Sequence, residues 1–249
     1  MKNVFKHLLH LSRSLALPTV LSLIALSIAF PLTTGAAFAQ SNGCGGNVQC
    51  IISFGNQRIA ERTEALNTLN GKITDQLNAK HITSDQASVL QSDVSTNLNN
   101  LANLQTKLDA ETTASAARQD VQSIYLQFRI YAVVLPRDYR EIHTDIASNL
   151  AAYLKNEESE LQQQINSAPS DKQQQLNTLY TDYTNHVSDA ANQVDTAQAG
   201  FPTLTPSTFN TNRSVYTSTL ASVTAADHTA HTDLHQAVND LNQMNSILG

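Results

Sequence analysis

The sequence predicts an all-α fold of long antiparallel helices that form an elongated helical bundle or coiled-coil-like hairpins. Aliphatic residues recur at intervals of three and four, which is the helical period, and no stretch alternates like a strand. Glycine and proline number only eight and six in 249 residues, so few positions interrupt a helix. The apolar stripes have near-heptad spacing, which favours bundle or coiled-coil packing over a compact globule.

Residues 1–39 have the order of a secretory signal peptide. Three basic residues precede an apolar run at about 15–30, and small residues follow, ending in Ala37-Phe38-Ala39. We expect cleavage after Ala39 and a secreted or extracytoplasmic location in the cell envelope. The alternative is an uncleaved membrane anchor, but Pro18 interrupts the run, which is shorter than the ~20 residues that span a bilayer.

The segment 40–53 is expected to be flexible, with the helical bundle domain following at 54–249. Its two cysteines, Cys44 and Cys50, are the only ones in the chain. In an oxidising compartment they predict one small disulfide ring, made feasible by the glycines between them. A metal site would need further cysteines or histidines at close spacing, and this stretch has none.

Two helices are predicted to form an antiparallel hairpin at the start of the domain. The first is marked by a stripe in which Gly71 is a weak position: Ile59, Arg62, Leu66, Leu69, Ile73 and Leu77. Thr83 followed by Gln86 is a capping-box start for the second helix, and the turn between them falls at about 80–82. The second stripe comprises Ala87, Leu90, Val94, Leu98, Leu101, Leu104 and Leu108.

A third helix is predicted from about Ala114 to Leu135. It is expected to end at Pro136, because proline disfavours helix in the residue before it. Its last turns are the most apolar and aromatic of the mature chain. They indicate either a binding groove or, as we prefer, a central helix buried on more than one face. Arg129 would then need a carboxylate or carbonyl partner.

Three more helices are predicted beyond Pro136, which makes a sub-division of the domain near residue 136 possible. Asp138 with Glu141 can cap the fourth helix. Ser170 with Gln173, after Pro169, can open the fifth, which Gly200 ends. Thr205-Pro206 supplies a cap and a first-turn proline for a last helix that reaches almost to the C-terminus.

Two junctions carry a resemblance to other proteins. They read Tyr125-Leu-Gln-Phe-Arg-Ile-Tyr-Ala-Val-Val-Leu-Pro136 and Phe201-Pro-Thr-Leu-Thr-Pro206. The chain resembles a group of secreted helical bacterial proteins that share a signal peptide, a Tyr-Arg-aromatic-Tyr-aliphatic-Pro junction and a Leu-Thr-Pro junction before a long last helix. The group has no known activity, so the resemblance implies the architecture and no catalytic residues.

The net charge of the chain limits the kinds of partner that it is expected to bind. The formal net charge is −6, and it becomes −9 once the three basic residues of the signal peptide are removed. A chain this acidic, without a lysine or arginine cluster, is a poor candidate for binding nucleic acid or an anionic membrane. After residue 54 the longest apolar run, Ile130 to Leu135, is too short to span a bilayer. We therefore expect no stable membrane span in the mature form.

The stretch Asp227-His-Thr-Ala-His-Thr-Asp-Leu-His235 concentrates three histidines. Spacings of three and four place His228, His231 and His235 on one side of a helix, roughly 110° from the apolar stripe, on an outer flank. They are a solvated polar row, a weak exposed metal site that lacks a further ligand, or a pH-sensing row. Asp227 projects into the apolar stripe, where it could pair with His231 or with Arg or Lys of a neighbouring helix.

No phosphate loop, nucleophile elbow or zinc-protease motif is present. We therefore predict a non-enzymatic, secreted or cell-envelope helical protein with a structural or protein-interaction role and no cofactor. Its partner would be another envelope or extracellular protein, or a second copy. Two alternatives stay open. One is an extracytoplasmic metal-binding protein that uses the histidine row, and the other is a membrane-active helical bundle in which Ile130 to Leu135 is the buried apolar segment.

Overall fold

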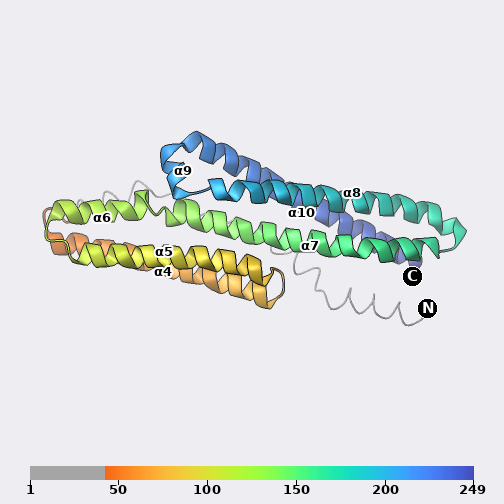
Figure 1. Ribbon diagram of the computed structural model, residues 1–249, viewed down its shortest axis with the longest axis horizontal. Coiled ribbons are helices and arrows are strands. Elements are labelled where there is room, and N and C mark those ends of the chain that lie inside the picture. Colours follow the sequence, from red (N-terminus) through yellow and green to blue (C-terminus); the bar gives the residue numbers. More distant parts are fainter. Residues whose placement is uncertain (1–42) are drawn as a thin grey trace. The chain divides into compact units, whose positions relative to one another are not determined.

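The computed structural model describes residues 43–249, which are almost entirely helical and contain no strand. The predicted signal peptide 1–39 and its predicted cleavage site lie outside the described residues. The elements in order are α4 (Val48–Asn78), α5 (Ser84–Asp109), α6 (Ala114–Leu126), the π-helix η2 (Ile130–Val134), α7 (Leu135–Asn166), α8 (Ser170–Gly200), the 3₁₀-helix η3 (Phe201–Thr203), α9 (Pro206–Thr211) and α10 (Arg213–Leu248). The predicted all-α fold of long antiparallel helices is confirmed (Figure 1).

The hairpin of α4 and α5 has the predicted turn. The hydroxyl of Thr83 accepts from the backbone N–H of Gln86, while the Gln86 side chain accepts from the backbone N–H of Thr83, so the capping box is complete. Lys80 has a φ of 59°, which turns the chain back after α4. The predicted stripe of α4 is buried except for Leu77, which is partly buried. It includes Arg62, whose guanidinium lies 4.7 Å and 4.9 Å from the ring centres of Tyr125 and Tyr131.

The helical part begins earlier than predicted. Helix α4 starts at Val48, inside the segment 40–53 that the sequence indicates as flexible, and the Asn47 side chain caps it by accepting from the backbone N–H of Cys50. Ile51 is fully buried. The apolar residues just before 54 therefore belong to the first turns of α4, where burial of Ile51 stabilises helix over flexible chain.

The predicted helix end at Pro136 is wrong. Helix α6 ends at Leu126, and Arg129 then adopts a left-handed conformation with a φ of 50°. A π-turn follows, in which the backbone N–H of Leu135 bonds to the carbonyl of Ile130, and Pro136 lies in the first turn of α7. Proline is tolerated there because the first-turn N–H groups have no partner within the helix. Asp138 is consequently not a helix cap, and its carboxylate is buried.

The second half of the chain follows its predicted signals in part. Helix α8 ends at Gly200, as predicted, but Ser170 does not cap its start, because the helix begins at Ser170 with no side-chain cap. The hydroxyl of Thr205 accepts from the backbone N–H of Thr208, as expected for a cap. The predicted last helix is nevertheless divided in two. Helix α9 ends at Thr211, and α10 begins at Arg213, where the Asn212 side chain caps it by accepting from the backbone N–H of Val215.

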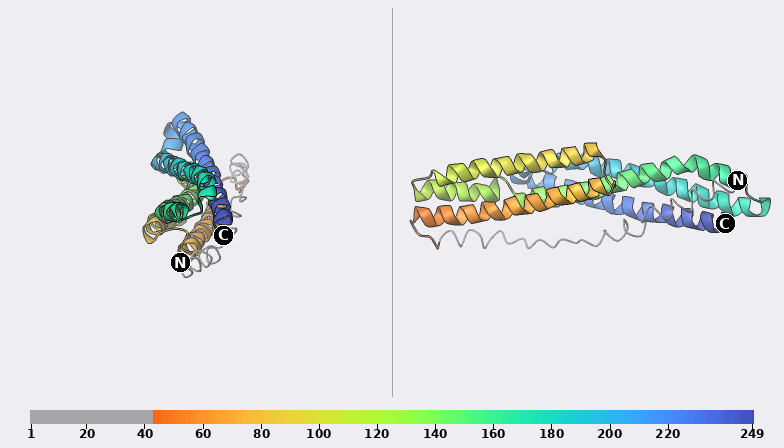
Figure 2. Two further views of the ribbon diagram at one scale, coloured as in Figure 1. Left: turned by 90° about the vertical axis from the view of Figure 1, so that its right-hand side faces the viewer. Right: turned by 90° about the horizontal axis from the view of Figure 1, so that it is seen from below.

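Two hydrophobic clusters lie on either side of η2. The first joins α4, α5 and α6 to the start of α7, and the second joins the ends of α8, η3 and α9 to the start of α10. The boundary between the two clusters falls within η2, since Val134 belongs to the first cluster and the adjacent Val133 belongs to the second. Near its start helix α7 contacts α4 and is linked to α5 by the ion pair of Arg137 and Asp93, and it packs against α8 along the rest of its length (Figures 1 and 2). The prediction of a central helix buried over Tyr125 to Leu135 holds in part, because Ile130, Val133, Val134 and Leu135 are buried, whereas Leu126 is 44% exposed at the end of α6.

Two glycines of α4 give a matched test of this packing. A Cβ on Gly55 would lie 2.4 Å from Leu108 Cδ2 and 2.8 Å from Val121 Cγ2, whereas a Cβ on Gly71 would meet nothing within 4 Å. Gly55→Ala is expected to lower the free energy of unfolding by about 1–2 kcal/mol, because both neighbours are buried. Gly71→Ala is expected to raise it by about 0.5–1 kcal/mol, through the helix propensity of alanine. Urea unfolding measures both values, and changes of the same sign would contradict the close approach.

Candidate functional site

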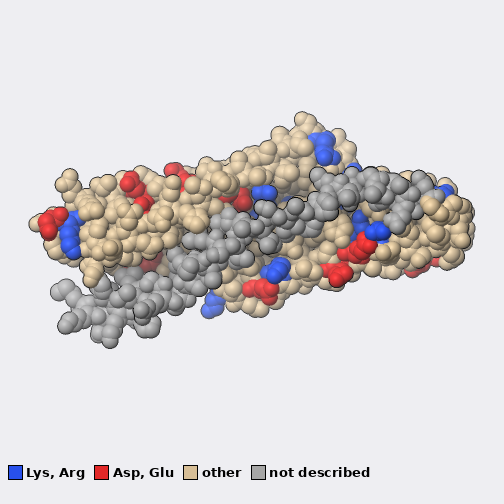
Figure 3. Space-filling model, turned by 180° about the vertical axis from the view of Figure 1, so that it is seen from behind, with Lys and Arg blue, Asp and Glu red and all other residues tan. Residues whose placement is uncertain are grey.

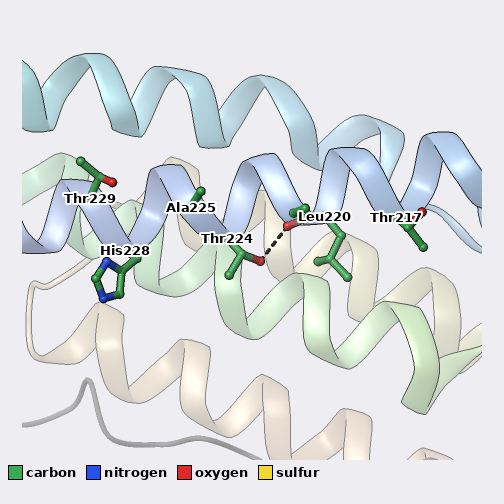
Figure 4. Close-up of a pocket in the computed structure, with 7 residues that line it drawn as sticks. Thr217, Leu220, Thr224, Ala225, His228 and Thr229 are labelled. Atoms are coloured by element: carbon green, nitrogen blue, oxygen red, sulfur yellow. Dashed lines mark hydrogen bonds between the residues drawn. The ribbon is translucent and has the colours of Figure 1, made fainter.

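The three histidines of α10 do not share one environment. His228 is exposed and lines a surface hollow together with Thr217, Leu220, Ala221, Thr224, Ala225 and Thr229. Figure 4 shows His228, Thr224 and Leu220 projecting from the same side of α10. His231 and His235 are only partly exposed. The predicted outer row of three histidines is therefore divided by the packing of α10.

His231 is turned toward α7 and not toward solvent. Its ring meets the ring of His143 edge to face, with centres 6.5 Å apart, and its buried Nε2 has no hydrogen-bond partner. Burial lowers the pKa of His231, while the charge of Asp227 opposes that shift. The helical projection was wrong for this residue because it considers one helix, and α7 covers the flank on which His231 lies.

Asp227 has the partners that its place in the apolar stripe predicts. It is 9% exposed between α7 and α10. The hydroxyl of Thr144 donates to its Oδ1 at 2.9 Å, and Arg140 Nη1 lies 3.7 Å from its Oδ2. His231 Nε2 is 3.8 Å from Oδ1. Side chains of both α7 and α10 thus form one polar cluster within an apolar interface. Such a cluster fixes how the two helices align.

The structure does not assemble the metal site that the sequence leaves open. Among residues 43–249, no three histidine, cysteine, aspartate or glutamate side chains are grouped so that they could hold a metal ion. His228 is exposed, whereas the ring of His231 packs on the ring of His143 of α7. The metal-binding alternative stays a prediction.

Sequence reasoning missed a row of three carboxyl groups on α7. Asp138, Glu141 and Asp145 follow one another at intervals of three and four, so they share one side of the helix. Arg137 bonds both to Asp138 and to Asp93 of α5. Burial raises the pKa of Asp138 and of Glu141 to about 7, although the charge of Arg137 opposes the shift at Asp138. Burial also raises the pKa of Asp145 to about 6. The helical spacing of these three acidic residues was the signal in the sequence that could have revealed the row.

The two cysteines form a disulfide at the start of α4. Cys44 and Cys50 are joined, with their Cα atoms 5.5 Å apart. Arg118 of α6 donates from its guanidinium to the carbonyl of Gly45, inside the ring that the disulfide closes. The ring therefore connects the beginning of α4 to α6 as well as constraining its own short loop.

No family model, curated protein or solved structure matches the chain. The resemblance to secreted helical bacterial proteins accordingly stays a prediction. In the described part of the chain, no helix is both long and apolar enough to span a bilayer. The apolar residues of η2 that the membrane-active alternative uses are packed between helices: Ile130, Val133 and Val134.

Proposed function

We propose that the chain is a non-enzymatic, extracytoplasmic helical protein with a structural or protein-interaction role, and that α10 presents its contact surface. The partner is a protein of the envelope or extracellular space, or a second copy of the chain. The observation that carries the proposal is the hollow on α10, because its lining contains only alanine, threonine, leucine and one histidine. Low-charge surface of this kind is typical of the central part of protein interfaces.

The low charge of the chain agrees with a binding role for α10. Only 14% of the residues of the chain are charged, and in Figure 3 the acidic and basic side chains stand singly or in small groups among uncharged ones. Behind the hollow, α10 packs along α8 and α7, and Asp227 ties it to Thr144. A contact surface on a helix held in this way is pre-organised, which lowers the entropy cost of binding.

Several polar side chains form hydrogen bonds between helices, which supports a structural role for these side chains. Tyr183 donates to the carbonyl of Leu154 at 2.6 Å, and Asn149 donates to the carbonyl of His81 and to the Gln86 side chain, both at 2.9 Å. Each of these bonds crosses from one helix to a neighbouring helix or turn. Polar bonds between helices, one of them buried and two partly buried here, specify one alignment of the helices.

Photo-crosslinking in intact producing cells tests the proposal. A photoreactive amino acid at Ala225, which is exposed in the hollow, is expected to give one discrete protein adduct. The matched control position is Ser188, exposed on α8. An additional Ala221→Arg change is expected to remove the adduct, because it places a long charged side chain in the hollow. No adduct, or the same adducts from Ala225 and Ser188, would refute the proposal. A product of twice the chain's mass identifies the partner as a second copy.

A further inference from the structure

Two arginines from distant parts of the sequence meet at one aromatic ring. The guanidinium carbon of Arg129, at the α6–η2 junction, lies 4.5 Å from the ring centre of Phe209, and that of Arg213, the first residue of α10, lies 3.6 Å from it. The Phe209 ring packs edge to face on Tyr216, with centres 4.9 Å apart. Tyr216 is buried in the second hydrophobic cluster, so the ring is a fixed support for both cations.

Arg129 is held in position by its backbone and by α9. Its φ of 50° is uncommon for a residue other than glycine, and its carbonyl accepts from the backbone N–H of Val133 at 2.8 Å. Its Nε donates to Asn210 Oδ1 at 2.9 Å, and Asn210 Nδ2 donates to the carbonyl of Leu126 at 2.5 Å. These bonds use only the Nε of the guanidinium, and they leave its terminal N–H groups for another acceptor.

Neither cation has a carboxylate partner within residues 43–249. Burial lowers the pKa of Arg129, and the neighbouring charge of Arg213 lowers it further. Arg213 also stands at the N-terminus of a helix of 36 residues, where the helix dipole is positive and free backbone N–H groups point outward. Positive charge from three sources thus collects at one place in a chain of formal net charge −6.

The arginine pair is in line with the hollow of the proposed contact surface. Arg213 and Thr217 are four residues apart on α10, so they lie on the same side of the helix, and Thr217 begins the lining of the hollow. A ligand that crosses this side of α10 therefore meets two cations at the start of the helix and uncharged small residues afterwards. An anionic membrane or a polyanion fits this arrangement poorly, because the uncharged hollow offers no further cations to bind it.

From this geometry we infer that Arg129 and Arg213 form a carboxylate-binding site for an acidic segment of a partner protein, whose adjoining uncharged residues run along the hollow of α10. Guanidinium groups bind carboxylates through paired hydrogen bonds, which fixes orientation as well as charge. The inference rests on the proposed interaction role of α10 and adds the chemistry that the partner must carry.

The first test measures the crosslink from Ala225 in cells that produce the full chain. Arg129→Gln and Arg213→Gln are each expected to reduce the adduct about tenfold, the equivalent of one lost charge-assisted contact. Arg213→Lys keeps the charge and loses the paired hydrogen bonds, so an intermediate yield is expected. Lys155→Gln, at an exposed cation on α7, is the matched control and should leave the yield unchanged. Thermal unfolding confirms that each variant is folded.

The second test separates the site from the proposed function. Succinate, inorganic phosphate and sodium chloride are titrated into the purified mature chain while the Nε–H signals of the arginines are followed by NMR. Succinate is expected to shift the signals of Arg129 and Arg213 at concentrations where chloride does not, and neither Gln variant should respond in this way.

An adduct that survives both Gln substitutions, or unshifted arginine signals, overturns the inference and leaves the proposed function standing. If the unchanged chain gives no adduct, the proposed function fails, and the succinate titration alone decides on the site. Preference for phosphate over succinate shows that the ligand class is wrong.

Discussion

Asp227→Ala is expected to lower the free energy of unfolding by about 2–4 kcal/mol, because it breaks a polar cluster between α7 and α10. The substitution leaves the fully buried hydroxyl of Thr144 without its acceptor and removes the nearest carboxylate from Arg140. Arg140 is partly exposed, so water can solvate its guanidinium, and most of the loss should come from Thr144 and the cavity. Urea unfolding at pH 7.5 measures the change.

A double-mutant cycle identifies the cause of that loss. Thr144→Val removes the hydroxyl while keeping the shape of the side chain, so it should relieve the unsatisfied donor that Asp227→Ala creates. The double variant Thr144→Val/Asp227→Ala is therefore expected to be less destabilised than the sum of the single changes, by about 1 kcal/mol. Strict additivity would show that Thr144 and Asp227 do not interact in solution.

Stability is expected to fall by about 2–3 kcal/mol as the pH rises from 5.5 to 7.5. The pKa values of Asp138 and Glu141 are raised to about 7, and that of Asp145 to about 6. A carboxyl group with a raised pKa in the folded state favours its neutral form there. Its stabilising contribution is complete below the pKa of the unfolded chain, near 4, and is lost as the pH rises through 6 to 7.

The histidines act in the opposite direction within the same pH range. Burial lowers the pKa of His143 and of His231, so the folded state favours neutral imidazole. Their contribution is complete above the unfolded pKa of about 6.5 and is lost as the pH falls. Asp227 raises the pKa of both histidines and so limits these shifts, whereas Arg140 lowers the pKa of His143 further. The carboxyl groups are expected to dominate, since they are three and their shifts are large.

Two variants separate these contributions. Glu141→Gln/Asp145→Asn removes two titrating groups that form no ion pair within residues 43–249, so the fall in stability between pH 5.5 and 7.5 should shrink. His143→Gln/His231→Gln removes the opposing contribution, so the fall should become steeper. Urea unfolding at pH 5.5, 6.5 and 7.5 gives the slopes. A stability of the unchanged chain that rises with pH would show that the carboxyl groups of α7 are ionised at little cost.

Local signals in the sequence were sufficient for much of the fold. The capping box of Thr83 and Gln86, the cap at Thr205 and the helix end at Gly200 all depend on residues within one turn of one another. Such contacts form in the same way whatever surrounds them. The helical period likewise predicted which side of α4 is buried, because its apolar stripe packs mainly against α5 and α6.

The junction before α7 could not be predicted in this way. Pro136 permits either a helix end before it or a place in the first turn of a helix, and the choice depends on the π-turn upstream. That turn follows the left-handed Arg129, whose side chain bonds to Asn210, 81 residues later. A distant contact of this kind leaves no periodic trace, so the sequence placed the break at the proline.

The candidate site was predicted in part for the same reason. The projection of α10 alone placed Asp227 in the packing seam, where it has Arg140 and Thr144 of a neighbouring helix as partners. His231 was misplaced because α7 covers a second side of α10. Helix α7 itself packs against α8, α10 and α4, so a single apolar stripe underestimates how much of it is buried, and sequence reasoning missed the carboxyl row.

The division of the apolar residues at η2 has a consequence for how the chain folds. The hairpin of α4 and α5 and the pair of α8 and α10 are each built from segments that are near neighbours in sequence. Closing such short connections costs little chain entropy, and low contact order is associated with fast folding. Each half can therefore acquire its structure as soon as its own residues are available. The two halves are then aligned through α7, which must form its contacts with both of them. This docking step is expected to limit the rate of folding.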